Sequence, residues 1–101
     1  MNADLNLVKK ERELKATIRQ AFITYQNQKE IVKILEENLE AAREDLRLAQ
    51  ERFNLGSGTS LELRQAQDDL TSAESNLVSA KYDAKIAEVE IDRLLGLMSI
   101  E

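Results

Sequence analysis

The chain reads Arg52-Phe53-Asn54-Leu55-Gly56-Ser57-Gly58-Thr59-Ser60-Leu61-Glu62-Leu63 where two long helical patterns meet, and this stretch decides the fold. Glycine at position 56 can adopt the left-handed conformation that ends a helix, because it has no Cβ. We therefore expect the first helix to end after Leu55. Thr59 and Glu62 fit a capping box, in which each side chain accepts a hydrogen bond from the backbone N–H of the other residue. The second helix is expected to begin at about Ser60.

Apolar residues on both sides of this tip recur at alternating spacings of three and four, as at the a and d positions of a heptad repeat. The first series is Leu14, Ile18, Ala21, Tyr25, Gln28, Val32, Leu35, Leu39, Ala42, Leu46, Ala49 and Phe53. The second is Leu63, Ala66, Leu70, Ala73, Leu77, Ala80, Ala84, Ala87, Ile91, Leu94 and Met98. Gln28 is a polar exception, which either sets the register or marks a place where this seam widens.

These patterns predict an all-α fold, an antiparallel two-helix coiled-coil hairpin, because a turn this short makes the two helices neighbours. We expect a single hairpin domain over residues 1–101, with helices at about 5–55 and 60–96 and a tip at 56–59. Gly96 is expected to fray the last turn. At about 1.5 Å per residue the helices span about 75 and 55 Å, so about 15 to 20 N-terminal residues should extend beyond their partner.

Two packing registers fit the seams. In the one we prefer, Phe53 faces Ala66 and Leu39 faces Ala80, so that large side chains meet alanine along the hairpin. In the alternative, shifted by one heptad, Leu46 faces Ala66 and Leu39 faces Ala73. The alternation of large and small residues supports both registers.

Further apolar residues lie outside the two seams. They are Ile23, Ile31, Ile34, Ala41, Leu48 and Leu55 before the tip, and Val78, Tyr82, Ile86 and Val89 after it. Either they belong to a solvated face, or each helix contacts a second neighbour. In the second case the hairpin is one stave of a larger helical wall.

The composition excludes several classes of function. The 101 residues carry a formal charge of −5 and contain no cysteine, histidine, tryptophan or proline. Zinc-ligand spacing and a nucleophile–base pair cannot be built, so we expect no enzyme, no metal and no cofactor. Dispersed lysines and arginines argue against nucleic acid and an anionic membrane surface as partners. No apolar run approaches the roughly 20 residues that span a bilayer, and residues 1–4 do not resemble a signal peptide, which an exported parent would carry outside this sequence.

A longer pattern resembles a known family. It runs Leu46-x-Leu48-Ala49-x-x-Arg52-Phe53-x-x-Gly56-x-Gly58-Thr59-Ser60-x-Glu62-Leu63-x-x-Ala66-Gln67-x-x-Leu70, then Ala73-Glu74-x-Asn76-Leu77-Val78-x-Ala80-x-Tyr82-Asp83, and ends Asp92-Arg93-Leu94-Leu95-Gly96. From about Ile18 to Gly96 the chain resembles the second internal repeat of the TolC-type outer-membrane efflux proteins.

The resemblance implies a segment of the periplasmic α-helical tunnel of a trimeric efflux or type I secretion channel in a Gram-negative outer membrane. Only parts outside this sequence would contact the membrane, and the isolated piece would be soluble. The tip would dock a periplasmic adaptor protein through Leu55, Gly56, Ser57, Gly58 and Thr59. Relatives can carry a bulky residue at position 58, so we expect the turn to survive Gly58→Arg.

The resemblance also implies residues near the tunnel aperture or lumen: Phe53, Glu62 and Gln65. Phe53 can equally end the core seam. For Glu62 the capping box at the start of the second helix is the preferred role. Gln65 departs from the acidic residue found in some relatives, so Glu62, with Asp68 or Asp69, would supply the charge of a lumen ring.

Two other classes remain. A periplasmic adaptor also has a long helical hairpin, but its spaced Arg-Leu-Ser tip pattern is absent from residues 52–64. A structural coiled-coil hairpin that acts as a spacer or oligomerisation module would make the glycine tip incidental.

Overall fold

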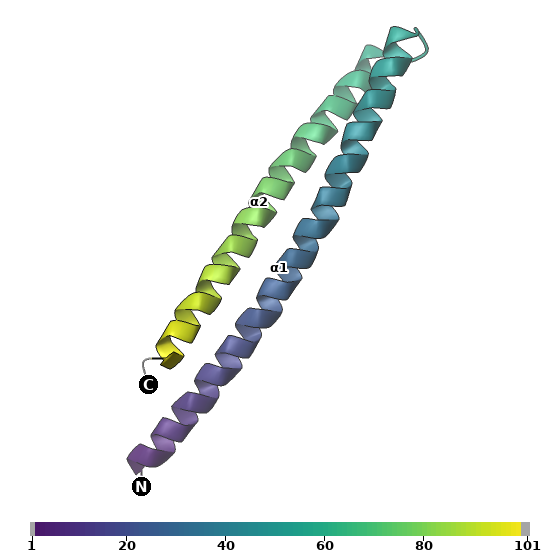
Figure 1. Ribbon diagram of the computed structural model, residues 1–101. Coiled ribbons are helices and arrows are strands. Elements are labelled where there is room, and N and C mark those ends of the chain that lie inside the picture. Colours follow the sequence, from purple (N-terminus) through teal and green to yellow (C-terminus); the bar gives the residue numbers. More distant parts are fainter. Residues whose placement is uncertain (1, 100–101) are drawn as a thin grey trace.

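The computed structural model describes residues 2–99 and contains two antiparallel helices, α1 (Asn2–Asn54) and α2 (Ser60–Ser99) (Figure 1). The described part holds no strand and measures 82 × 16 × 15 Å. The predicted all-α hairpin is therefore confirmed. Residues 1, 100 and 101 of the predicted single domain lie outside the described part.

Both helices are longer at their outer ends than predicted. α1 begins at Asn2 instead of about residue 5, and α2 continues through Gly96 to Ser99 instead of ending at Gly96. A glycine inside a helix costs only about 1 kcal/mol relative to alanine. Leu94, which is 4% exposed, anchors this part of α2 against α1, so packing outweighs the intrinsic preference of one residue.

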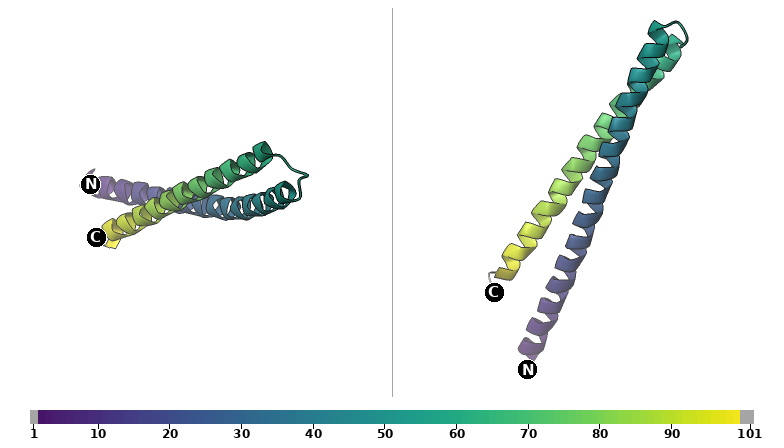
Figure 2. Two further views of the ribbon diagram at one scale, coloured as in Figure 1. Left: turned by 90° about the horizontal axis from the view of Figure 1, so that it is seen from above. Right: turned by 45° about the vertical axis from the view of Figure 1, so that its right-hand side comes forward.

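The predicted seams form the contact between the helices. Every seam residue from Leu14 to Ala49 on α1 and from Leu63 to Leu94 on α2 is buried or half-buried. Seen from above, the two helices cross each other (Figure 2), as expected for a coiled coil. No side chain in the described part is completely enclosed, because each helix packs against a single neighbour.

The preferred packing register is wrong, and the alternative is correct. One groove between the helices is lined by Tyr25 and Glu88, and another by Leu14 and Met98. In the preferred register Tyr25 would face Leu94, six residues and about 9 Å from Glu88. The observed pairs instead match the register in which Leu46 lies level with Ala66 and Leu39 with Ala73.

The physical reason lies in the tip. Only five residues, 55–59, join Asn54 to Ser60. Two of their N–H groups, from Ser57 and Gly58, donate to the Arg52 carbonyl oxygen at 2.9 Å and fold the loop back onto α1. The ends of the two helices must therefore lie nearly level, and this excludes the register that pushes α2 beyond α1.

The N-terminal overhang is shorter than predicted. Residues 2–13 are all exposed, whereas Leu14 lines a groove with Met98 of α2. The overhang is about 12 residues because the correct register and the longer α2 both move the end of α2 towards the N-terminus of α1.

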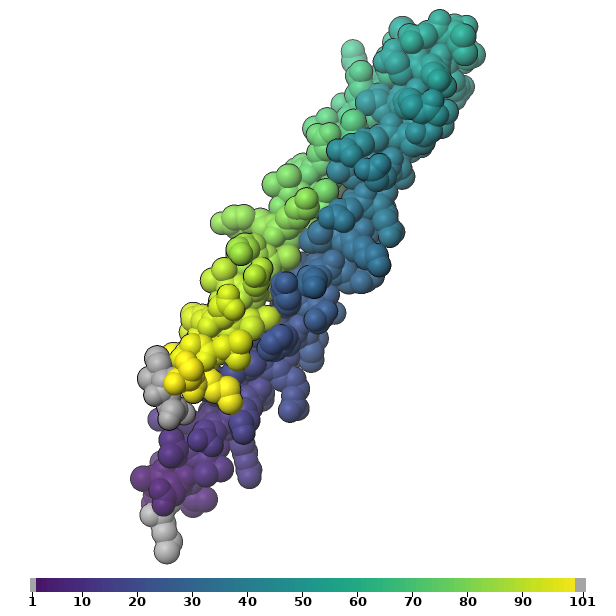
Figure 3. Space-filling model, in the orientation of Figure 1, coloured from purple at the N-terminus to yellow at the C-terminus, as the bar shows by residue number. Residues whose placement is uncertain are grey.

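The additional apolar residues are exposed on the surface of the hairpin. The space-filling view shows the hairpin as a long rod (Figure 3). On α1, Ile34 is 48% and Leu48 44% exposed, and Ala41 between them is exposed as well. On α2, Val78 and Tyr82 are 68% and 69% exposed. The hairpin alone does not cover these rows.

Candidate functional site: the hairpin tip

A glycine-dependent cap ends α1. Gly56 has a φ of +79°, and its N–H donates to the Phe53 carbonyl oxygen at 3.1 Å. The Ser57 N–H donates to the Arg52 carbonyl oxygen at 2.9 Å. Together with the left-handed conformation of Gly56, these two hydrogen bonds form a Schellman motif. The predicted helix stop at Gly56 is confirmed.

Gly58 is required for a different reason. Its φ is not positive, but a Cβ on it would lie 3.0 Å from the Arg52 Cβ and 3.2 Å from the Phe53 backbone nitrogen. The loop backbone therefore packs directly on the last turn of α1. A side chain at position 58 would fit tightly against that turn, which would have to shift by a few tenths of an ångström. The survival of the turn in Gly58→Arg stays a prediction.

Half of the predicted capping box is present. The Glu62 N–H donates to the Thr59 hydroxyl at 3.1 Å, which caps the start of α2. The Glu62 carboxylate does not complete the box. One of its oxygens instead lies 3.6 Å from Nη2 of Arg52, which carries the opposite charge. Both side chains are about half exposed, so this ion pair contributes at most about 1 kcal/mol.

Apolar side chains project from the tip into solvent. Leu55 is 82% exposed, Leu61 73% and Phe53 41%. The prediction that Phe53 packs on Ala66 fails, because in the observed register Phe53 lies level with Thr59, where α2 has not yet begun. Phe53 therefore belongs to the exposed tip and not to the core.

The other polar candidates lie on the first turns of α2. The Gln65 side-chain amide donates to a carboxylate oxygen of Asp69 at 3.0 Å. Asp68 is exposed and lies on a different face of the helix from Asp69. The structure thus brings Gln65 next to Asp69 and Glu62 next to Arg52.

Arg52 and Leu61 were missed from the sequence as tip residues. The Arg52 carbonyl oxygen accepts three loop hydrogen bonds, from the Ser57 and Gly58 N–H groups and from the Ser57 hydroxyl. Its side chain pairs with Glu62. It also shares a surface groove with Leu48 and Glu62. Arg52 could have been identified from the sequence because it lies four residues before Gly56. In a Schellman motif the carbonyl group at that position accepts a hydrogen bond from the loop.

The described residues include no group of histidine, cysteine, aspartate or glutamate arranged to hold a metal ion. Within the same range, neither helix has an apolar stretch long and uncharged enough to cross a membrane. The tip combines a hydrogen-bonded, closely packed backbone with exposed apolar side chains and one ion pair. This arrangement suits a contact with another macromolecule.

The geometry defines a long coiled-coil hairpin with a closely packed glycine tip. A model of the family "Outer membrane efflux protein" matches residues 2–97, and the chain belongs to this family. Its members are channels rather than enzymes. The outer membrane efflux protein BepC of Brucella suis biovar 1 (strain 1330) is 31% identical over 83 residues. The alignment covers 79% of this chain and 18% of that relative, and no solved structure matches.

Proposed function

We propose that this hairpin is a wall segment of the periplasmic tunnel of an outer-membrane efflux channel and that its tip docks a periplasmic adaptor protein. Family membership supports the channel, and the exposed tip supports the docking. The observation that carries the docking role is Leu55, which is 82% exposed beside a backbone whose turn needs Gly56 and whose close packing on α1 needs Gly58. An apolar anchor on a preordered loop loses little entropy when it binds.

The two exposed apolar rows support a wall that curves. With about 103° per residue in a heptad repeat, the α1 row through Ala41 and Leu48 lies about 130° from the seam. The α2 row through Tyr82 and Val89 lies about 180° from its seam. If each row contacts a further helix, α2 has its two neighbours on opposite sides, about 180° apart, and the wall is nearly straight there. The two neighbours of α1 are only about 130° apart, so the wall bends at α1. The bend is towards the side that carries Arg52.

This curvature bears on the lumen residues. Glu62 and Asp69 are one heptad apart on the side of α2 towards which the wall bends, and Gln65 lies close to the same face. Asp68 points along the wall instead. We therefore assign Glu62 and Asp69, with Gln65 between them, to the tunnel interior of a trimer. Arg52 neutralises part of the charge of Glu62 there, and the exposed Phe53 lies nearest the aperture.

The docking role is tested in the intact parent protein by Leu55→Asp. Leu55 is exposed and its side chain takes no part in the cap, so the fold is expected to survive while efflux-dependent resistance is lost. Leu5→Asp is the matched control, because Leu5 is 68% exposed at the opposite end of the rod. A Ser57→Cys variant provides a single thiol in this segment for crosslinking to the adaptor.

Normal efflux in Leu55→Asp, together with no adaptor crosslink from Ser57→Cys in a protein that reaches the outer membrane, would remove the docking role. The second candidate function is a structural spacer or oligomerisation module, which the uncovered rows on both helices favour. In that case Val78→Asp would abolish assembly while Leu55→Asp had no effect on any activity.

A further inference from the structure

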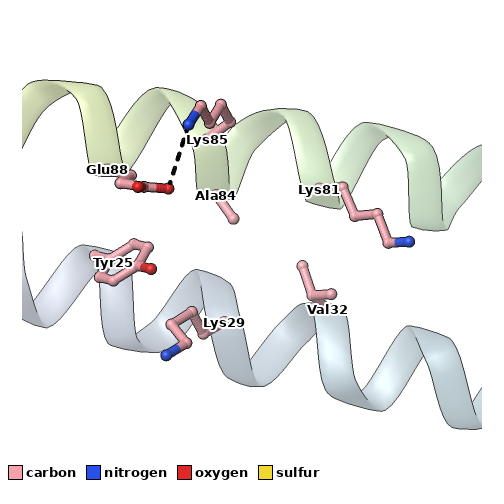
Figure 4. A pocket seen from close by; sticks show the side chains of 7 residues that line it. All are labelled: Tyr25, Lys29, Val32, Lys81, Ala84, Lys85 and Glu88. Atoms are coloured by element: carbon pink, nitrogen blue, oxygen red, sulfur yellow. Dashed lines mark ion pairs between the residues drawn. The ribbon is translucent and has the colours of Figure 1, made fainter.

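A groove crosses the coiled-coil seam far from the tip, on the side of the hairpin opposite to the Arg52–Glu62 pair. Its floor consists of Tyr25 and Val32 of α1 and Ala84 of α2 (Figure 4). Ala84 is small, and Gln28 replaces an apolar residue at the same level of the seam. This layer is therefore incompletely filled, and it leaves an opening of about 240 Å³.

Lysines surround the apolar floor. Lys29 of α1 and Lys81 and Lys85 of α2 line the groove, with Glu88 as the single acid. Lys85 lies 3.7 Å from Glu88, and the Lys29 ammonium lies 5.4 Å from the centre of the Tyr25 ring. No ion-pair partner of Lys81 is found among the described residues. The groove is thus locally positive in a chain whose formal charge is −5.

We propose that this groove binds an acidic polypeptide segment, which inserts one apolar side chain between Tyr25 and Val32 and places carboxylates near the lysines. Charge complementarity indicates an anionic partner. Lys81 and Lys85 are one helical turn apart, about 6 Å along α2, and Lys29 lies on the other helix. Carboxylates spaced along a peptide match lysines that are spread along α2 and across to α1.

The groove is an outward surface of the proposed tunnel wall, since the wall bends towards the opposite side. The binding itself does not depend on the tunnel. It requires only the hairpin, so its test can fail while the proposed function stands, and the reverse also holds.

The experiment titrates the isotope-labelled 101-residue chain with a short helical peptide that carries one leucine and glutamates one turn to either side. Chemical shifts are expected to change at Tyr25, Val32 and Ala84 and not at the tip. A peptide with glutamine in place of each glutamate is expected to bind at least about tenfold more weakly. Added salt should weaken binding of the acidic peptide, because the lysines are exposed.

Two variants, one with a control, test separately the contributions of the lysine charges and of the apolar opening to peptide binding. Lys81→Gln combined with Lys85→Gln is expected to weaken binding about tenfold. Lys9→Gln combined with Lys10→Gln, which makes the same change in net charge on the exposed N-terminal overhang, should have no effect. Ala84→Leu fills the opening and should abolish binding without lowering the melting temperature.

Five results would overturn the proposal. The first three are equal binding of the acidic and glutamine peptides, equal weakening by the two lysine pairs, and shifts outside the groove. The fourth is tighter binding of dodecanoate monomers than of the peptide, which would assign the groove to small amphipathic anions. Concentration-dependent shifts at the groove without peptide would assign it to a second copy of the chain and would equally refute the proposal.

Discussion

Gly56→Ala is expected to destabilise the hairpin although the added methyl group meets nothing. A Cβ at position 56 would have no heavy atom within 4 Å, so the cost comes from the backbone alone. The φ of +79° costs an L residue about 1–2 kcal/mol. Asparagine tolerates this conformation better, and Gly56→Asn is therefore expected to cost about 1 kcal/mol or less.

The two other glycines provide matched comparisons. Gly58→Ala places a Cβ 3.0 Å from the Arg52 Cβ, and the last turn of α1 must move; overpacking of this kind costs about 1–3 kcal/mol. Gly96→Ala meets nothing within 4 Å and lies inside α2. It is expected to stabilise the hairpin by about 0.5–1 kcal/mol, because alanine restricts the unfolded chain and favours the helix.

Thermal unfolding followed by far-ultraviolet circular dichroism measures all four variants, at a protein concentration where sedimentation shows a monomer. A change of 1 kcal/mol shifts the melting temperature by about 4–8 °C in a domain of this size. From highest to lowest, the expected melting temperatures are those of Gly96→Ala, the unsubstituted chain, Gly56→Asn and Gly56→Ala. Gly58→Ala is also expected to melt below the unsubstituted chain. A Gly56→Ala protein that melts no lower than the unsubstituted chain, or a Gly56→Asn protein that melts below Gly56→Ala, would refute the backbone explanation.

Three further predictions concern the helices. Leu39 is 8% exposed, so Leu39→Ala should lower the stability by about 2 kcal/mol. Leu48 is 44% exposed, so Leu48→Ala should lower it by only about 0.5 kcal/mol or less. Equal melting temperatures of the two variants would contradict the assignment of Leu39 to the seam. Gln28→Leu should stabilise the hairpin by about 1 kcal/mol if the seam merely widens there, whereas a loss of stability or a changed assembly in sedimentation would indicate a register-setting role. Hydrogen bonds from Arg47 lower the pKa of Glu44, so Arg47→Gln should raise that pKa in an NMR titration. The small stability that this pair contributes is fully present above the pKa that Glu44 has in the unfolded chain. It is lost as the pH falls through the lower pKa that Glu44 has in the folded chain. An unchanged Glu44 pKa would show that the pair does not form in solution.

The local rules of helix formation and capping were readable from the sequence. Every residue that the heptad spacing assigned from Leu14 to Ala49 and from Leu63 to Leu94 is buried or half-buried, and only Glu88 and Glu90 add half-buried positions within these ranges. Gly56 and Thr59 were found because a helix stop and an N-cap each require a particular residue type within a few positions. The tip could therefore be located without any knowledge of how the two helices meet.

The sequence by itself determined two helices, a sharp tip and the face by which each helix contacts the other, because these depend on residues close together in the chain. Only the tertiary structure decided the register, since a seam that repeats every seven residues permits a shift by one heptad until the folded loop fixes the helix ends. The same closure exposed Phe53, pressed Gly58 against Arg52 and turned Glu62 from its own cap towards that arginine. These contacts join residues on opposite sides of the turn, and their geometry exists only once the turn has closed.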